Sequence, residues 1–243
     1  MRSFRVLATV ALVAMVPGHA LVAQGRPTPQ ELFDRHARAV GGREAWARVR
    51  TREDVGTAVL NGNAARVTIR WAAPRRWALV YDFADSSQTW NGYDGAVAWY
   101  EDGFANTNRV QGVDSLNYAL TADLVGTLHP AGTLQSAEVV GEETFDGQPA
   151  WRVRVVHPGG TERTYFFARA SGLRIGELAP NTGGVRTITI KSWMTVDGLT
   201  VPSWWTVASP STSREFRITQ VRFGVPVDAT IFRAPAFGAD VEP

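Results

Sequence analysis

The chain has 243 residues, with 25 Lys and Arg against 23 Asp and Glu, so its charges nearly balance. This balance gives no reason to expect a nucleic acid or an anionic surface as partner. The absence of cysteine excludes thiolate metal sites, cysteine nucleophiles and disulfides, so the stability must come from a buried core.

Residues 1–24 are typical of a secretory signal. Arg2 and Arg5 give a positive start, and Val6–Val16 is a short apolar run without a charge. That run is shorter than the about 20 apolar residues needed to span a bilayer. We therefore expect a cleaved signal, export to the periplasm, and a mature chain 25–243 that forms one domain without a transmembrane segment. Removal of the signal leaves equal numbers of basic and acidic residues.

The mature chain is expected to begin with a helix. Thr28 to Glu31 reads T-P-Q-E, a capping box with Pro at the first helical position. Apolar residues follow at helical spacing, and Gly41-Gly42 is predicted to end the helix. A short helical turn is expected at Arg43–Val49.

From Glu53 the apolar residues alternate, which predicts strands. We expect strands over 53–60, 64–71, 77–83 and 95–101, with a turn at Asn91–Gly95. The segment Gly103–Gln111 is polar and is predicted to be irregular. Asp114–Val125 is predicted to be a helix capped by Asp114, with Leu116, Leu120 and Leu124 forming one apolar stripe.

Strands resume at about residue 137 and continue almost to the end. They are expected over 138–143, 150–157, 161–168, 173–178 and 215–223, with a long hairpin at 185–207. An Asp-Gly pair at 197 marks the tight turn of that hairpin. A two-residue turn predicts these pairs on its apolar face: Val196 with Leu199, Met194 with Val201, Ser192 with Ser203, Ile190 with Trp205 and Ile188 with Val207. Lys191 is expected opposite Trp204 on the other face.

This order of elements predicts an α+β fold that is mainly antiparallel β. No βαβ alternation occurs, so the sheet should be antiparallel and strongly curved, with helices on one face. No stretch rich in Pro, Gly or Ser divides the chain.

The common catalytic and metal-binding patterns are absent from the sequence. The mature chain contains His36, His129 and His157, and their spacing matches no helix-borne metal site. No G-x-S-x-G elbow or phosphate-binding glycine loop occurs. We therefore expect no catalytic residues, no metal and no cofactor, and the protein is not expected to be an enzyme.

Four stretches resemble the outer-membrane lipoprotein-sorting, LolA/LolB-like superfamily. They are VVGEETFDGQPAWRVRV at 139–155, YFFARASGLR at 165–174, WMTVDGLTVP at 193–202 and ITQVRFGVPVDATIFRAP at 218–235. The N-terminal helix with its Gly-Gly end is also similar. The resemblance implies an incomplete antiparallel β-barrel with helices over its concave face, enclosing an apolar cavity that holds lipid acyl chains.

Our first hypothesis is a periplasmic carrier or sensor that binds a lipid, a lipoprotein acyl chain or another apolar ligand between sheet and helices. The candidate ligand-binding residues are the inward positions of the first strands and the helix stripe: Val67, Ile69, Trp71, Trp77, Leu79, Tyr81, Trp99, Leu116, Leu120 and Leu124. Each of these side chains could equally belong to an ordinary core.

Two alternatives stay open at this point. The same fold with a filled core would be an interaction module that docks onto an envelope protein through an edge strand or patch. A hydrolase would need polar groups that only the fold brings together. An accessible cavity separates the carrier from the interaction module.

Overall fold

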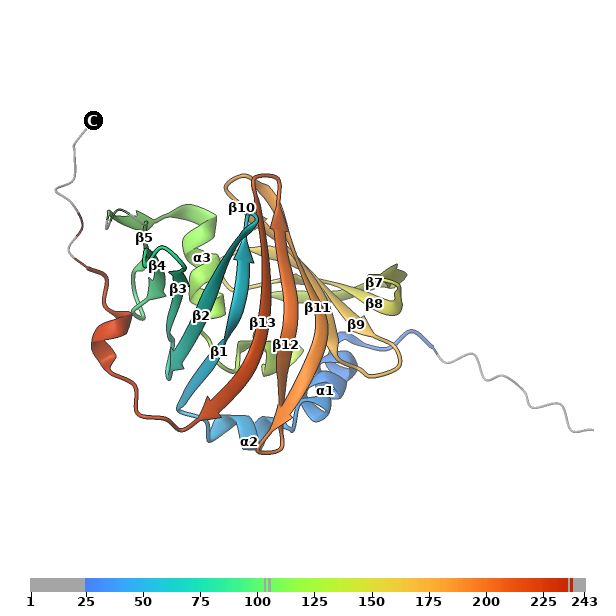
Figure 1. Ribbon diagram of the computed structural model, residues 1–243. Helices are drawn as coiled ribbons and strands as arrows, with labels where there is room; N and C mark the ends of the chain where they lie inside the picture. Colours follow the sequence, from blue (N-terminus) through green and yellow to red (C-terminus); the bar gives the residue numbers. More distant parts are fainter. Residues whose placement is uncertain (1–24, 103, 105, 236, 238–243) are drawn as a thin grey trace, which may run out of the picture.

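The computed structural model describes residues 25–102, 104, 106–235 and 237, so the predicted signal, 1–24, lies outside the described residues. One antiparallel sheet of 13 strands forms the body of the protein (Figure 1). The strand order is β6-β5-β4-β3-β2-β1-β13-β12-β11-β10-β9-β8-β7. The two outermost strands, β6 and β7, do not pair with each other, so the sheet curves without closing. The expected incomplete β-barrel is confirmed.

The strands are long at the centre of the sheet and short at one edge. Their bounds are β1 (Thr51–Leu60), β2 (Asn63–Ala72), β3 (Arg76–Phe83), β4 (Gln88–Tyr93), β5 (Ala98–Glu101), β6 (Thr107–Val110), β7 (Ser136–Phe145), β8 (Gln148–Val156), β9 (Glu162–Ala168), β10 (Arg174–Asn181), β11 (Gly184–Val196), β12 (Leu199–Ser209) and β13 (Thr212–Phe223). The helices are α1 (Pro29–Ala39), α2 (Arg43–Ala47) and α3 (Gly112–Thr121), and the 3₁₀ turns are η1 (Gly126–Leu128), η2 (Ala131–Thr133) and η3 (Ala229–Phe232).

The helices α1, α2 and α3 lie on the concave side of the sheet (Figure 1). Leu32 and Phe33 of α1 are buried against inward side chains of β7, β8 and β9. Helix α3 contacts β10 on one side and β4 and β5 on the other, so it crosses the open side of the curve. Within the described part of the chain, no helix has the length and apolar character to cross a membrane.

Local chemistry explains the starts and stops of these elements. The capping box of α1 is present, with the Thr28 side chain accepting from the Glu31 N–H and the Glu31 side chain accepting from the Thr28 N–H. Asp197 and Gly198 both have positive φ, at 52° and 78°, as a tight hairpin turn requires.

The long hairpin has the predicted register, with one local irregularity. Ile188, Ile190, Met194 and Val196 face their predicted partners on β12. The prediction that Ser192 faces Ser203 and Lys191 faces Trp204 is wrong, because a bulge-like shift places Ser192 opposite Trp204. The two serine hydroxyls nevertheless hydrogen-bond at 2.8 Å.

Two short strands were not predicted. Strand β4 includes the Asn91-Gly92 pair that we interpreted as part of a turn, because both residue types are usual in turns. Glycine is needed there for another reason: a Cβ on Gly92 would lie 2.4 Å from the Trp99 ring. Strand β6 is a polar edge strand within the segment predicted to be irregular, and its composition carries no alternation of apolar residues.

Helix α3 begins earlier and ends earlier than predicted, since Leu124 lies beyond its last residue. Its N-cap is Gln111, which makes no side-chain cap bond, so the prediction that Asp114 caps it is wrong. The Asp114 carboxylate instead accepts from the N–H of Thr182 at 3.3 Å. The most buried residue of the helix is Asn117, at 1% exposure, whereas Leu116 is 45% exposed.

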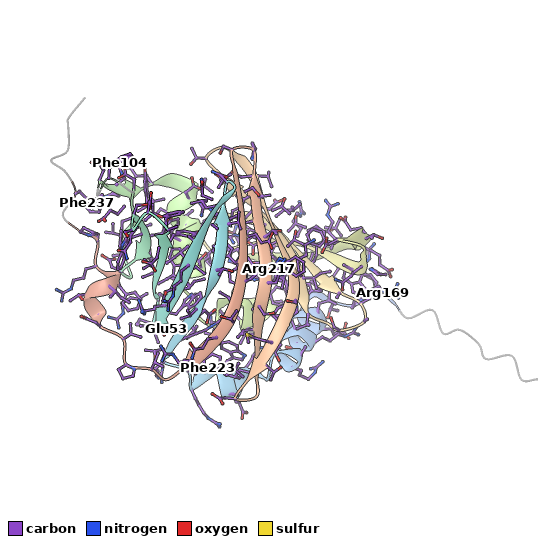
Figure 2. The ribbon with its side chains drawn as sticks, in the orientation of Figure 1. Glu53, Phe104, Arg169, Arg217, Phe223 and Phe237 are labelled. Atoms are coloured by element: carbon purple, nitrogen blue, oxygen red, sulfur yellow. The ribbon has the colours of Figure 1, made fainter. Side chains whose placement is uncertain are left out.

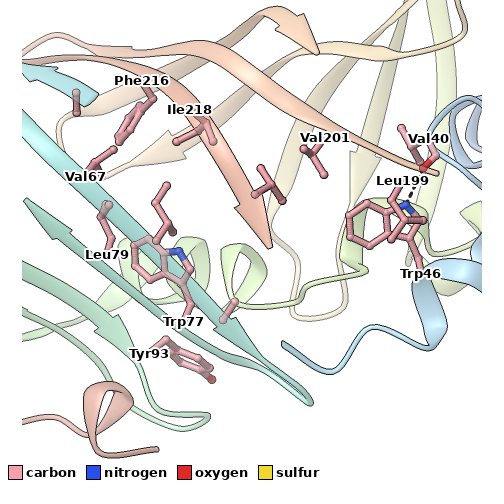
Figure 3. Packing of buried hydrophobic residues seen from close by; sticks show 14 of the residues in the cluster. Val40, Trp46, Val67, Trp77, Leu79, Tyr93, Leu199, Val201, Phe216 and Ile218 are labelled. Carbon is pink, nitrogen blue, oxygen red and sulfur yellow. Dashed lines mark hydrogen bonds between the residues drawn. The ribbon is translucent and has the colours of Figure 1, made fainter. Parts of the chain in front are cut away.

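The largest buried cluster lies between the concave faces of β1–β3 and of β12 and β13. Val67, Leu79, Phe216 and Ile218 belong to it, as does Trp46 from α2 (Figure 3). The Trp46 indole N–H donates to the Val40 carbonyl at 2.8 Å, which fixes α2 against the end of α1. This cluster fills the concave side over β1–β3, β12 and β13, and the cluster around α1 fills it over β7–β9.

Candidate functional site

A cavity of about 450 Å³ remains on the concave side, between the sheet and the helices. That volume is within the about 300–1,000 Å³ usual for small-ligand pockets. It is lined by α1, α2, the segment from α3 to η2, and inward side chains of the sheet. The apolar lining residues are Phe33, Val40, Trp46, Trp71, Leu120, Leu124, Leu128, Leu134, Pro158, Ile188, Ile190, Trp193, Val201 and Pro202.

Three of the predicted ligand-binding residues line this cavity: Trp71, Leu120 and Leu124. Trp71 lies on β2, and its indole N–H donates to the Thr121 carbonyl at 3.0 Å. Leu120 is on the last turn of α3, and Leu124 follows the helix. The end of the helix and the segment after it therefore form part of the cavity wall.

The structure places the other predicted residues elsewhere. Val67, Ile69, Trp77, Leu79 and Tyr81 are buried in the core cluster beside the cavity. Trp99 faces the opposite side of the sheet, where its indole N–H donates to the Phe232 carbonyl at 3.2 Å. Leu116 points toward solvent. The period-two pattern identified inward positions on β2 and β3 correctly, but it did not show where the packed core ends.

A buried polar cluster forms one part of the cavity wall. Glu177 on β10 is 4% exposed and receives a hydrogen bond from Arg163 of β9. Arg174 also donates to the Glu177 carboxylate, at 3.2 Å. Nη2 of Arg186, on β11, is 4.0 Å from Glu177 Oε1. Three guanidinium groups from three neighbouring strands thus surround one carboxylate.

The ionisation of Glu177 reflects this environment. Burial favours the neutral acid, but the attraction of Arg163, Arg174 and Arg186 together outweighs it and keeps the pKa of Glu177 below its usual value. Burial lowers the pKa of Arg186, and the Glu177 charge opposes that effect. Arginine remains charged in proteins. The cluster is therefore ionised at neutral pH.

The remaining polar groups of the cluster are neutral. Burial, followed by the positive charge of Arg163, lowers the pKa of His157 to about 4. His157 Nε2 is 2.8 Å from the Tyr165 hydroxyl. Burial raises the pKa of Tyr165 to about 12. Neither group contributes a charge to the cavity near neutral pH.

A second arginine in the cavity wall has its own partner. Arg52 donates to both carboxylate oxygens of Asp54, at 2.7 and 2.5 Å, and Asp54 is fully buried. The Arg52 guanidinium also lies 4.8 Å from the centre of the Trp71 ring. This pair is neutral overall, so it differs from the cluster around Glu177.

The cavity combines apolar walls with hydrogen-bond donors, which suits binding of an amphiphilic molecule. No group of three or more His, Asp or Glu side chains that could hold a metal ion occurs among the described residues.

Arg217 lies on the outer face of the sheet, away from the cavity (Figure 2). Its guanidinium is 4.0 Å from the centre of the Trp204 ring.

Sequence reasoning missed the residues of this cluster, although a signal was present. In V-R-T-I-T-I, alternation places Arg186 on the same face as Ile188 and Ile190. In R-T-Y, the same rule places Arg163 with Tyr165. A charged residue in line with inward apolar residues indicates a buried charge, and such a charge requires a partner.

Comparison with known proteins shows the fold. No protein-family model matches the sequence, and no curated protein matches it. A DUF1329 family protein from Desulfovibrio piger superimposes with a TM-score of 0.57 at 12% identity, covering 85% of this chain and 98% of that one. A LolA superfamily protein from Nitrosomonas europaea gives 0.56 at 8% identity, over 86% of this chain and 98% of its own.

A third solved structure, described as an outer membrane lipoprotein-sorting protein domain from Vibrio parahaemolyticus, has a TM-score of 0.55 at 11% identity. It covers 84% of this chain and 95% of that chain. The similarity therefore extends over most of each molecule, although few residues are identical. The chain has the LolA-like fold, and the resemblance noted in its sequence motifs is confirmed at the level of the fold.

Proposed function

We propose that this protein is a carrier that binds the apolar chain of a lipid or an acylated protein, non-covalently, between its sheet and its helices. The observation that carries the proposal is the cavity of about 450 Å³ with a mainly apolar wall. An apolar chain gains about 0.8 kcal/mol for each buried CH₂, so about eight methylenes contribute about 6 kcal/mol. A filled core, which the interaction module requires, would leave no such space.

The comparisons support the same function at a coarser level. One protein of the same fold is described as an outer membrane lipoprotein-sorting protein domain. Together with the signal-like segment 1–24, this supports a place in the periplasm for the mature chain.

Native mass spectrometry of the mature protein, purified from a periplasm, tests the carrier function. We expect additional mass from bound lipid or acylated protein, which solvent extraction then releases for identification. A protein without added mass, both as purified and after incubation with lipids, would contradict the proposal.

A matched pair of variants locates the ligand. Leu120→Trp places a larger side chain into the cavity and should reduce loading. Leu116→Trp makes the same change one turn earlier on α3, at a position exposed to solvent, and should leave loading unchanged. Equal loading of the two variants would mean that α3 does not cover the ligand.

A further inference from the structure

The Arg186 guanidinium lies in the cavity wall, mostly buried with its side chain 19% exposed, and it lacks adequate partners. Its Nε has no hydrogen-bond partner among the described residues. Its nearest acidic group, Glu177, is 4.0 Å from Nη2, beyond hydrogen-bond distance. Glu177 is already bonded to Arg163 and Arg174, so Arg186 shares a carboxylate that other cations occupy.

Positive charge exceeds negative charge around this position. Arg163 donates one hydrogen bond to Glu177 and another to the side-chain oxygen of Asn117 on α3. Both terminal nitrogens of Arg163 therefore already have partners within the protein. Three arginines, Arg163, Arg174 and Arg186, lie within 4.0 Å of the single carboxylate of Glu177. His157 is neutral here. An uncompensated cation is costly in a buried place, because few water molecules solvate it.

The charged part of the wall adjoins the apolar part along one strand. Arg186, Ile188, Ile190 and Trp193 of β11 all line the cavity. Successive residues of a strand are about 3.3 Å apart, so this lining extends over about 20 Å. A ligand lying along β11 therefore meets a guanidinium group at one end of the strand and apolar side chains of the same strand beyond it.

Resting on the proposed carrier function, we infer that the cavity takes an amphiphile with an anionic oxygen headgroup, either a carboxylate or a phosphate ester. Its oxygens bind the guanidinium groups of Arg186 and Arg174, and its chain follows Ile188 and Ile190 toward Trp193. Guanidinium forks match both headgroups, since each offers two oxygens for paired hydrogen bonds. A neutral lipid would leave the excess charge without a partner.

Tryptophan fluorescence provides the test, because Trp46, Trp71 and Trp193 line the cavity. The purified mature protein is titrated at neutral pH with dodecanoate, dodecyl phosphate, dodecanol and inorganic phosphate. At least one of the two anionic chain compounds should bind about 10- to 100-fold more tightly than dodecanol, the range expected for a hydrogen bond to a charged group. Comparison of these two compounds identifies the headgroup.

Each other result overturns the inference in a distinct way. Equal affinity for dodecanol and for both anionic compounds would leave the carrier function in place and remove the anion site. Inorganic phosphate binding as tightly as dodecyl phosphate would mean that the chain contributes nothing. Binding by none of the chain compounds would overturn the inference and the proposed function together.

Variants assign the preference to Arg186. Arg186→Met should reduce the preference for the anionic compound about 10-fold or more while dodecanol still binds. Arg186→Lys keeps the charge but loses the fork, so an intermediate preference is expected. Arg217→Met, on the outer face, is the control and should behave like the wild-type protein. A wild-type preference in both Arg186 variants would overturn the assignment. If the variants do not fold, the comparison of compounds on the wild-type protein still tests the inference.

Discussion

The backbone N–H of Arg174 donates a hydrogen bond to Nδ1 of His36 at 3.2 Å. This bond joins the first strand residue of β10 to helix α1, two elements far apart in the sequence. His36 is buried, and burial, followed by the charges of Arg174 and Arg43, lowers its pKa to about 3. The ring must stay neutral for Nδ1 to accept this bond.

Acid should weaken the fold through His36. Because the folded pKa, about 3, is below the value of about 6.5 in the unfolded chain, the unfolded chain binds more protons between these limits. Stability should therefore fall as pH falls from 6.5, by about 1.4 kcal/mol per pH unit for this one group. Urea unfolding of the wild type and of His36→Gln between about pH 6.5 and 4.5 measures the difference in slope. A slope in His36→Gln equal to that of the wild type would contradict the assignment.

Loss of the Glu177 charge should destabilise the protein strongly. Glu177→Gln leaves the charges of Arg163, Arg174 and Arg186 close together without a counter-ion. Removal of one partner from a buried pair costs about 3–5 kcal/mol, and denaturant unfolding should show a loss of that size. Glu143→Gln removes an exposed partner of Arg152 and should cost at most about 1 kcal/mol. Similar losses in the two variants would mean that the cluster carries no special stability.

Replacement of Arg186 should have the opposite effect on the empty protein. Arg186→Met exchanges a poorly paired, mostly buried cation for an apolar side chain, while Glu177 keeps Arg163 and Arg174. The free energy of unfolding should rise by about 1 kcal/mol or more, with a higher melting temperature. Arg163→Met is the contrast, because that change removes bonds to both Glu177 and Asn117 and should lower the melting temperature. A lower melting temperature in Arg186→Met would show that Arg186 stabilises the fold.

The bulge in β1 should depend on glycine. The register of β1 against β13 shifts between Val55 and Gly56, and a Cβ on Gly56 would lie 2.0 Å from the Arg217 carbonyl oxygen. Gly56→Ala should therefore reduce the free energy of unfolding by about 1–3 kcal/mol, since the strands must separate locally. Gly132→Ala, where a Cβ meets nothing within 4 Å, is the control. A loss no larger than that of the control would contradict the close approach.

Much of the fold could be predicted because it depends on local chemistry. Asp197-Gly198 fixed the long hairpin, and Thr28 with Glu31 fixed the start of α1. The side of the sheet that Trp99 faces could not be predicted from local chemistry. Its strand pairs with β4, whose Asn91-Gly92 has the composition of a turn, so the neighbours of Trp99 were not identified.

The candidate site was only partly predictable. Trp71 and Leu120 were identified from periodicity, and both line the cavity. Arg163, Glu177 and Arg186 belong to three separate strands, and only the strand order brings them together. No local sequence pattern indicates the order of the strands in the sheet. Whether a given inward side chain meets a neighbour or empty space also depends on the packing of distant elements.

The crowded positive charge around Glu177 also means that occupancy and folding are coupled. A molecule that binds only the folded chain raises its stability by mass action, and the gain grows as its concentration exceeds the dissociation constant. An anion that relieves the repulsion among these arginines should therefore raise the melting temperature more than a neutral compound of equal size. Thermal denaturation across a panel of cell-envelope extracts thus becomes a search for the natural cargo that requires no prior guess of its identity.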